Sequence, residues 1–285
     1  MCDEMFLENF ALGWKGRQLA SSDDQSLPFK YFKTSPKIIR LAVMLYVRFP
    51  LSLRNVEDLL HERGIDISHE TVRFWWHRFG PMFASEIKKR RIEGLRRSHW
   101  RWHLVEVFVM INGERHYLWR AVDHEGEVLE SFVTKTRDKK AALKFLKKTM
   151  RKHGRPEVIV TDRLRSYGAG LREIGVGNRQ EAGRWLNNRA ENSHLPFRRR
   201  ERAMLRFRRI PTLQKFAAVH ASISNHFNQE RHLYSRPNFK LNRAAALAEW
   251  RLLCSAQVRV FGGKLRRVGI LLTEPPLSKI WTSHR

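Results

Sequence analysis

The hydrophobic pattern changes its period near residue 102, and this change constrains the fold more than any other feature of the sequence. Between residues 35 and 80, apolar side chains recur at the spacing of one face of an α-helix. From Leu104 to Thr134, apolar and polar residues alternate, as they do in β-strands with one buried face. We therefore predict an all-α region followed by a region built on a β-sheet.

The second region is predicted to be an α/β domain. Asn112-Gly113, between two alternating segments, is a strong signal for a two-residue hairpin. The expected order is strand, strand, strand, helix, strand, helix, over residues 104–111, 116–122, 128–134, 138–153, 158–161 and 163–173. Further helices are expected after residue 185. A three-strand meander with a crossover strand gives a mixed sheet with helices on its faces.

The all-α region has the pattern of a helix-turn-helix. Three helices are expected, beginning at Ser35-Pro36, Ser52 and Ser68, and the second ends at Gly64. Two amphipathic helices joined by a short turn that contains glycine are typical of this motif. The polar face of the third helix carries Arg73 and Arg78, which are suited to phosphates or guanine edges. An ordinary three-helix bundle with a solvated face explains the same pattern.

The charge of the chain indicates a polyanionic partner. It has 55 Lys and Arg against 28 Asp and Glu, a formal net charge of +27. Phosphate backbones attract such an excess and release counterions on binding. No apolar run has the length of a membrane helix, and no signal peptide is evident. With 2 cysteines, a disulfide scaffold or a cysteine zinc site is excluded. We expect a cytoplasmic nucleic-acid protein without a membrane partner.

Two acidic residues are candidates for chemistry. Asp162 follows the buried strand, at the sheet edge where α/β proteins bind ligands, and its carboxylate suits Mg²⁺. From its position alone, the N-cap of the following helix is the better explanation for it. Glu191 precedes seven arginines within twelve positions, more than it and Glu201 can neutralise. The surplus favours phosphate binding; the cluster comprises Arg198, Arg199, Arg200, Arg202, Arg206, Arg208 and Arg209.

Taken together, these segments resemble an insertion-sequence transposase. The helix-turn-helix is followed by HWRWHLVEVFVMINGERHYLWRAVDHEG, VIVTDRLRSYG and NNRAENSHLPFRRRERAMLRFR. In combination they are similar to the insertion-sequence-six family of DDE transposases over about residues 28 to 250. The TD strand end and the NNR-x-EN-x-H block are specific together and weak singly.

The resemblance implies an RNase H-like catalytic domain in which three acids hold two Mg²⁺ or Mn²⁺ ions. Asp162 matches the second acid and Glu191 the third, at a shorter spacing than is usual in the family. Arg198 matches a basic position that faces DNA, and His194 either lines the same site or makes a structural hydrogen bond. The expected partners are double-stranded DNA, as transposon ends and target, and a second copy in a homodimer.

The first acid of the family pattern is missing. Where the family has W-x-x-D-E, this chain has Trp102 followed by Val105 and Glu106. Glu106 cannot simply replace the acid, because neighbouring strand residues point to opposite faces. Since the carboxylates of a two-metal site fix both ions, we predict that this copy folds and binds DNA but is catalytically impaired.

The expected organisation follows from these assignments. It comprises an N-terminal extension, a helix-turn-helix domain, a basic helical linker, an RNase H-like catalytic domain and an irregular tail, over residues 1–34, 35–85, 86–101, 102–253 and 254–285. The tail indicates an altered reading frame or a read-through end, and a disordered basic tail is the alternative. Two other functions stay open, a non-catalytic helix-turn-helix DNA-binding protein such as a repressor and a nuclease acting on RNA–DNA hybrids.

Overall fold

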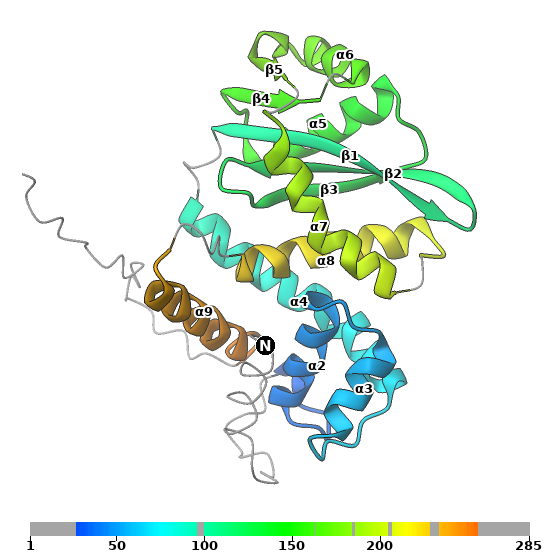
Figure 1. The fold of residues 1–285 in the computed structure, drawn as a ribbon, viewed down its shortest axis with the longest axis vertical. Helices are drawn as coiled ribbons and strands as arrows, with labels where there is room; N and C mark the ends of the chain where they lie inside the picture. Colours follow the sequence, from blue (N-terminus) through cyan, green and yellow to red (C-terminus); the bar gives the residue numbers. More distant parts are fainter. Residues whose placement is uncertain are drawn as a thin grey trace, which may run out of the picture. The chain divides into compact units, whose positions relative to one another are not determined.

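The computed structural model describes residues 27–95, 100–162, 164–183, 186–204, 207–228 and 234–255 (Figure 1). The chain divides into two units, residues 1–255 and 256–285, and the second unit lies outside the described residues, as does most of the expected N-terminal extension. The helices are η2 (Leu27–Phe29), α2 (Pro36–Arg48), α3 (Leu53–His61), α4 (His69–Leu95), α5 (Lys139–His153), α6 (Arg165–Ile174), η3 (Gly177–Arg179), α7 (Asn188–Ala203), α8 (Ile210–Phe227) and α9 (Arg236–Arg251). The strands are β1 (Arg101–Ile111), β2 (Glu114–Asp123), β3 (Val128–Thr134), β4 (Val158–Thr161) and β5 (Gln180–Ala182).

Serine caps begin the first three long helices, and the three predicted starts are confirmed. Ser35 accepts a hydrogen bond from the backbone N–H of Lys37 at the start of α2. Ser52 and Asn55 form a reciprocal capping box at α3. Ser68 accepts from the backbone N–H of Thr71 at the start of α4. Each cap satisfies a backbone donor that has no partner within its helix.

Helix α4 is longer than the sequence indicates, because it continues through Pro81 to Leu95. Pro81 has no N–H, so the carbonyl of His77 loses its partner within the helix. The Nζ of Lys215, on α8, donates to this oxygen at 3.0 Å. The helix passes the boundary expected at residue 85 and occupies residues 86–95 of the expected linker. The positions of the domain boundaries therefore stay a prediction.

The sheet has five strands in the order β3-β2-β1-β4-β5. Strands β1, β2 and β3 form the predicted antiparallel meander, and β4 pairs in parallel with β1. Asn112 and Gly113 have φ values of 50° and 82°, as a two-residue hairpin requires. The sequence analysis missed β5, which pairs in parallel with β4. A mixed sheet of this order with helices on its faces is the predicted RNase H-like architecture.

Helices cover the two faces of the sheet (Figure 1). On one face, Trp102 and Leu104 of β1 pack in a cluster with Trp119 and with residues of α5 and α6. On the other face, helices α7 and α8 contact β1, β2 and β3. There, Val109 and Ile111 belong to the largest hydrophobic cluster. Residues of β1 therefore alternate between two different environments, which fixes the register of the strand.

The largest hydrophobic cluster also joins the N-terminal helices to the C-terminal ones. It contains residues of α2, α3 and α4 together with residues of α7, α8 and α9. Two hydrogen bonds connect the ends of the described chain: Arg40 Nε donates to the Leu253 carbonyl at 2.7 Å, and Trp250 Nε1 donates to the Arg40 carbonyl at 3.2 Å. The helix-turn-helix region thus shares its core with the helices that follow the sheet.

Candidate functional site

The site is built where three elements meet beside the central strand. The parallel register of β1 and β4 places Leu104 opposite Thr161, so Asp162 follows β4 at the level of Val105. Helix α7 begins at the same place, because Asn187 Nδ2 donates to the Leu104 carbonyl at 2.9 Å. Position 105, Asp162 and the first turn of α7 therefore come from adjacent elements.

Val105 lies in an apolar environment between the sheet and helices α7 and α8. Its exposed fraction is 7%, and it packs in a cluster with four other residues, Val122, Val128, Ala190 and Ala221. Ala190 directly precedes Glu191, so position 105 faces the helix that carries the predicted third acid. Valine fills this position well and supplies no ligand atom.

Arg120 is the residue opposite Val105 on the neighbouring strand β2. Its exposed fraction is 2%, and burial alone lowers its pKa to about 10. One nitrogen, Nη1, donates to the Ser193 carbonyl at 2.8 Å, whereas Nε is buried without a partner. No carboxylate among the described residues forms an ion pair with it. The structure therefore has a buried cation directly beside position 105.

Glu106 lies on the opposite face of β1 and has a partner of its own. The exposed fraction of its side chain is 4%, and it forms an ion pair with Arg137, a residue just before α5. Burial, followed by the charge of Asp162, raises the pKa of Glu106 to about 7, and Arg137 opposes this shift. Tyr167 of α6 is also buried here, and its pKa is raised well above its usual value by burial and by both carboxylates. Glu106 therefore belongs to a charged cluster on the α5–α6 side of the sheet.

Asp162 is more open than Glu106. The exposed fraction of its side chain is 39%, and Oδ2 lies 4.0 Å from the Arg137 guanidinium. Its Oδ1 accepts a hydrogen bond from the Leu164 backbone N–H at 3.1 Å. Leu164, not Asp162, occupies the N-cap of α6, and it makes no side-chain cap. The carboxylate is thus held by a local turn and remains accessible from solvent.

Glu191 and His194 lie on the first turns of α7. Glu191 is exposed, whereas both ring nitrogens of His194 are buried without a hydrogen-bond partner. Burial, then Arg120 and Arg198, lower the pKa of His194 to about 3, so its imidazole is neutral at physiological pH. The structural hydrogen bond considered for His194 is not present among the described residues.

The residues present do not fit a pair of divalent ions. Across the described part of the chain, no group of three or more His, Cys, Asp and Glu is arranged to hold a metal. Position 105 is apolar, and Glu106 faces away from α7 and is paired with Arg137. Asp162 and Glu191 therefore lack the acid between them that a two-metal site requires.

The predicted phosphate-binding arginines of α7 fall into two groups. Arg199 and Arg202 are exposed, and Arg198 donates to the Phe108 carbonyl at 2.6 Å and to Glu201 at 2.5 Å. Arg200 is different, because its exposed fraction is 1%. It donates to the Leu51 carbonyl at 2.7 Å and lies over the rings of Tyr46 and Phe216. The role expected for Arg200 in binding phosphate does not fit its burial, whereas Arg199 and Arg202 are exposed and Arg198 is partly buried.

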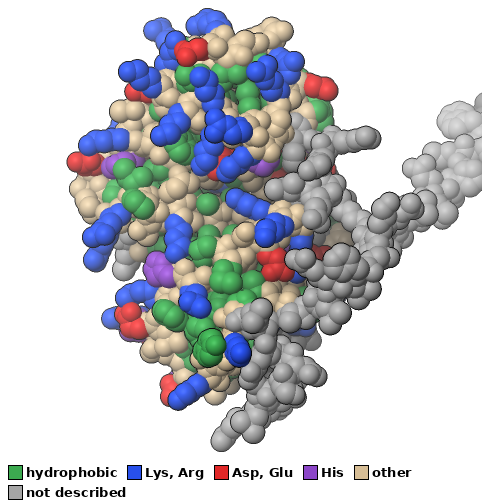
Figure 2. Space-filling model, turned by 180° about the vertical axis from the view of Figure 1, so that it is seen from behind, with side chains coloured by type: hydrophobic (Ala, Val, Ile, Leu, Met, Phe, Trp, Pro, Cys, Tyr) green, Lys and Arg blue, Asp and Glu red, His purple; other side chains and the backbone are tan. Residues whose placement is uncertain are grey.

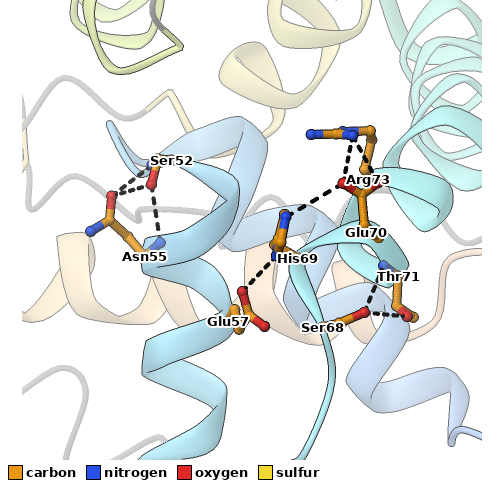
Figure 3. Close-up of polar contacts among 8 residues, drawn as sticks. All are labelled: Ser52, Asn55, Glu57, Ser68, His69, Glu70, Thr71 and Arg73. Atoms are coloured by element: carbon orange, nitrogen blue, oxygen red, sulfur yellow. Dashed lines mark hydrogen bonds and ion pairs between the residues drawn. The ribbon is translucent and has the colours of Figure 1, made fainter.

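The two arginines predicted to read DNA lie on α4, and Figure 3 shows one of them, Arg73. Arg73 is exposed and donates to both carboxylate oxygens of Glu70 at 2.7 Å. His69 connects the helices of the motif, since its Nδ1 lies 2.9 Å from Glu57 of α3. Arg78 is exposed and lies over the ring of Phe32 at 5.6 Å. The polar face predicted for this helix is therefore solvent-accessible and joined to α3.

Basic side chains are spread over much of the surface. Figure 2 shows Lys and Arg side chains over most of the face that it presents, with few Asp and Glu between them. Among the described helices, none combines the length and apolarity needed to span a bilayer. The distribution agrees with a polyanionic partner that contacts the chain at more than one place.

Sequence reasoning missed three residues of the site. Arg120 is indistinguishable in the sequence from the exposed arginines around it, and its burial follows from the pairing of β2 with β1. Arg137 meets Glu106 across 31 positions, a pairing that no local pattern indicates. Tyr167 lies on the predicted helix face, but its neighbours come from other elements. The alternation of β1 did indicate that residues 105 and 106 differ in environment.

Comparison with known proteins gives consistent matches over the sheet region. A family profile described as a DDE domain, of the IS240 transposase type, matches residues 99–230. The chain is 29% identical over 171 residues to the transposase for insertion sequence-like element IS431mec of Staphylococcus aureus, covering 58% of this chain and 75% of that protein. It is 28% identical, over the same length and coverage, to the S. aureus transposase for insertion sequence element IS257 in transposon Tn4003.

Similarity to solved structures is weaker. The catalytic domain of Mos1 transposase aligns with 63% of this chain and 94% of its own length, at a TM-score of 0.33 and 15% sequence identity. A TM-score at this level adds nothing to the assignment, which depends on the sequence relatives and on the strand order described above.

Proposed function

From the premise that this chain belongs to the insertion-sequence-six family of bacterial DDE transposases, we propose that it binds transposon ends without cutting them. The family acts by DNA strand transfer. Our proposal is that this copy keeps the DNA-binding surfaces and has lost metal-dependent cleavage. It would act in the cytoplasm as a homodimer on double-stranded DNA, and no membrane partner is proposed.

One observation carries the catalytic part of the proposal, the apolar contact of Val105 with Ala190. An intact site would hold Mg²⁺ or Mn²⁺ through an acid at position 105 together with Asp162 and Glu191, and the ions would supply charge stabilisation at the phosphodiester. The buried Arg120, which has no carboxylate partner among the described residues, supports the view that an acid at position 105 is compatible with this fold. Glu106 points to the other face of β1 from Val105, although its partner Arg137 also lies 4.0 Å from Asp162.

The DNA-binding part depends on accessible guanidiniums in two places. Arg73 and Arg78 on α4 are proposed to contact the terminal inverted repeats, and Arg198, Arg199 and Arg202 on α7 are proposed to contact phosphates near Asp162. Binding through phosphates should weaken steeply as salt increases, because counterions are released. A chain that binds ends without cleaving them would function as a non-catalytic DNA-binding protein, the alternative that Val105 favours.

Val105→Asp tests this proposal directly. We expect no Mg²⁺-dependent cleavage of terminal-repeat DNA by the unsubstituted chain and clear cleavage by Val105→Asp. Because removing a central electrostatic contributor commonly costs about 10² to 10³ in rate, a gain of at least that size is expected. Cleavage by labelled-duplex assay is the measurement, with Val105→Asn as the uncharged control of the same shape.

Duplex binding measured in parallel separates the two parts of the proposal. The unsubstituted chain, Val105→Asp and Val105→Asn should bind terminal-repeat duplexes with similar affinity. Robust cleavage by the unsubstituted chain would contradict the impairment. Absence of duplex binding in all three proteins would contradict the DNA-binding assignment.

A further inference from the structure

A large aromatic side chain is exposed on the sheet beside the candidate site. Phe108 of β1 has an exposed fraction of 54%, and Met110 on the same strand has 40%. Both lie on the same face of β1 as Glu106, because side chains alternate along a strand. Val109 and Ile111, which point to the other face, are buried. Two residues of strand separate Phe108 from Glu106, roughly 7 Å.

Two guanidiniums flank the Phe108 ring. Those of Arg115 and Arg198 each lie 5.4 Å from its centroid. Arg198 is fixed by its bonds to the Phe108 carbonyl and to Glu201. Arg115 is exposed and has no hydrogen bond or ion pair with any residue in the described ranges. One of the two guanidiniums over the ring is therefore bonded to neighbouring groups, and the other has no such bond among the described residues.

The surroundings of Phe108 carry unneutralised positive charge. The hairpin end of β1 is joined to the segment after α7, because Asn112 Nδ2 donates to the Arg208 carbonyl at 2.9 Å. The nearby acids Glu106, Glu114 and Glu201 each have a basic partner. Within the described chain, no ion pair neutralises the exposed guanidiniums of α7 and of the segment that follows it, namely Arg199, Arg202, Arg208 and Arg209.

We infer that Phe108 is a stacking site for an unpaired nucleotide of the bound DNA. An aromatic face accepts any base, and base–aromatic stacking with basic residues beside it is a common mode of single-strand binding. A base stacked on Phe108 would place its phosphate within reach of Arg115, which is free to leave the ring. Phe108 is not one of the positions that would hold metal, although it lies on the same strand as Val105.

An unpaired nucleotide fits this surface better than an apolar protein segment does. Covering Arg115 and Arg198 with apolar groups would bury guanidinium donors without partners, which is costly. A base within an intact duplex offers no free face, because both of its faces are stacked. The occupant is therefore a nucleotide in a single-stranded overhang, of the kind present next to a nicked or frayed DNA end.

The inference depends on the DNA binding proposed above, so its test compares two forms of DNA. One is a terminal-repeat duplex, and the other is the same duplex with a single-stranded overhang of about eight nucleotides that contains 5-iodo-deoxyuridine. Binding of each is measured by fluorescence anisotropy with the unsubstituted chain and with Phe108→Leu. Met110→Leu is the matched control, because Met110 is a second exposed apolar residue on the same strand without a guanidinium over it.

We expect Phe108→Leu to bind the overhang DNA about tenfold more weakly and the blunt duplex unchanged. Phe108→Trp should bind the overhang at least as well as the unsubstituted chain, and this result excludes misfolding as the cause. Irradiation should crosslink the iodinated base to Phe108, as identified by mass spectrometry.

Equal overhang binding by Phe108→Leu and the unsubstituted chain, with duplex binding intact, would overturn this inference alone. Loss of all DNA binding in every protein would overturn it together with the proposed function. Self-association that disappears in Phe108→Leu, measured by sedimentation without DNA, would identify a second copy as the occupant and would also overturn it.

Discussion

Each face of the sheet has one buried charged residue at the level of positions 105 and 106. The two differ in whether the described residues supply a partner of opposite charge. On the α5–α6 side, Glu106 is buried and is paired with Arg137. On the α7–α8 side, Arg120 is buried opposite Val105, and within the described part of the chain its guanidinium bonds to one carbonyl and to no carboxylate. The comparison shows that one buried charge of the sheet has an opposite charge beside it, whereas the other lies beside an apolar side chain.

This difference has an energetic consequence. A buried ion pair contributes little compared with apolar residues of similar volume, whereas one buried charge without its partner is strongly destabilising. Valine in place of an acid at position 105 therefore need not unfold the protein, provided that the Ser193 carbonyl and nearby groups support Arg120. The stability of the fold and the chemistry of the site place different demands on the same position.

The largest expected effect is the coupling between position 105 and Arg120. Val105→Asp should change the free energy of unfolding little while Arg120 is present, because the new carboxylate gains a partner. In Arg120→Met, the same substitution should destabilise the fold by about 3–5 kcal/mol, the cost of an unpaired buried charge. Urea denaturation of the four proteins of the double-mutant cycle in metal-free buffer gives the coupling. A coupling near zero would show that the two side chains do not meet.

The pH dependence of Glu106 gives the next largest effect. Its pKa is about 7 in the folded chain against an ordinary 4.5, so the folded state binds more protons between these values. Stability should therefore decrease as the pH rises from about 4.5 to about 7 and then become level, with a total change of up to about 3 kcal/mol.

Glu106→Gln isolates this contribution. The variant should lose the decrease between pH 4.5 and 7 and should be more stable than the unsubstituted chain at pH 8, as measured by thermal unfolding at several pH values. Glu114→Gln, at an exposed acid on the same sheet, should leave the profile unchanged. Identical profiles for Glu106→Gln and the unsubstituted chain would show that Glu106 titrates normally.

The third and smallest expected effect is the contribution of the buried Arg200 guanidinium to the free energy of unfolding. Its partners are neutral, namely the Leu51 carbonyl and the rings of Tyr46 and Phe216. Arg200→Ala should destabilise the fold by about 2 kcal/mol through the lost hydrogen bond and packing. Arg202→Ala, two positions along α7 and exposed, should remain within about 0.5 kcal/mol of the unsubstituted chain. Equal values for both would place Arg200 at the surface.

Local signals account for what the sequence predicted well. Serine caps, the Asn112-Gly113 turn and the alternation of β1 each depend on neighbouring residues, and all appear at the expected positions. Strand β5 was missed because three largely polar residues have no detectable period. The length of α4 was missed because Pro81 normally ends a helix, and only the tertiary contact from Lys215 supplies the missing donor.

In the candidate site, too, local features can be predicted from the sequence, whereas contacts between distant elements cannot. The chain position of Asp162 and the missing acid at position 105 are visible in the sequence, since both are matters of local pattern. Arg120, Arg137 and Arg200 acquire their roles from residues of other elements. Nothing in a run of arginines distinguishes Arg200, whose guanidinium is buried, from Arg199 beside it, which is exposed.

The bond from Arg200 to Leu51 has a consequence for how the molecule responds to DNA. Helix α7 carries Glu191 near one end and is attached near its other end, through Arg200, to the connection between α2 and α3. A displacement of the connection between α2 and α3 would act on α7 through Arg200, although Pro196 interrupts the hydrogen bonding of this helix. The helix-turn-helix region and the helix that packs against Val105 are in this way linked through one hydrogen bond.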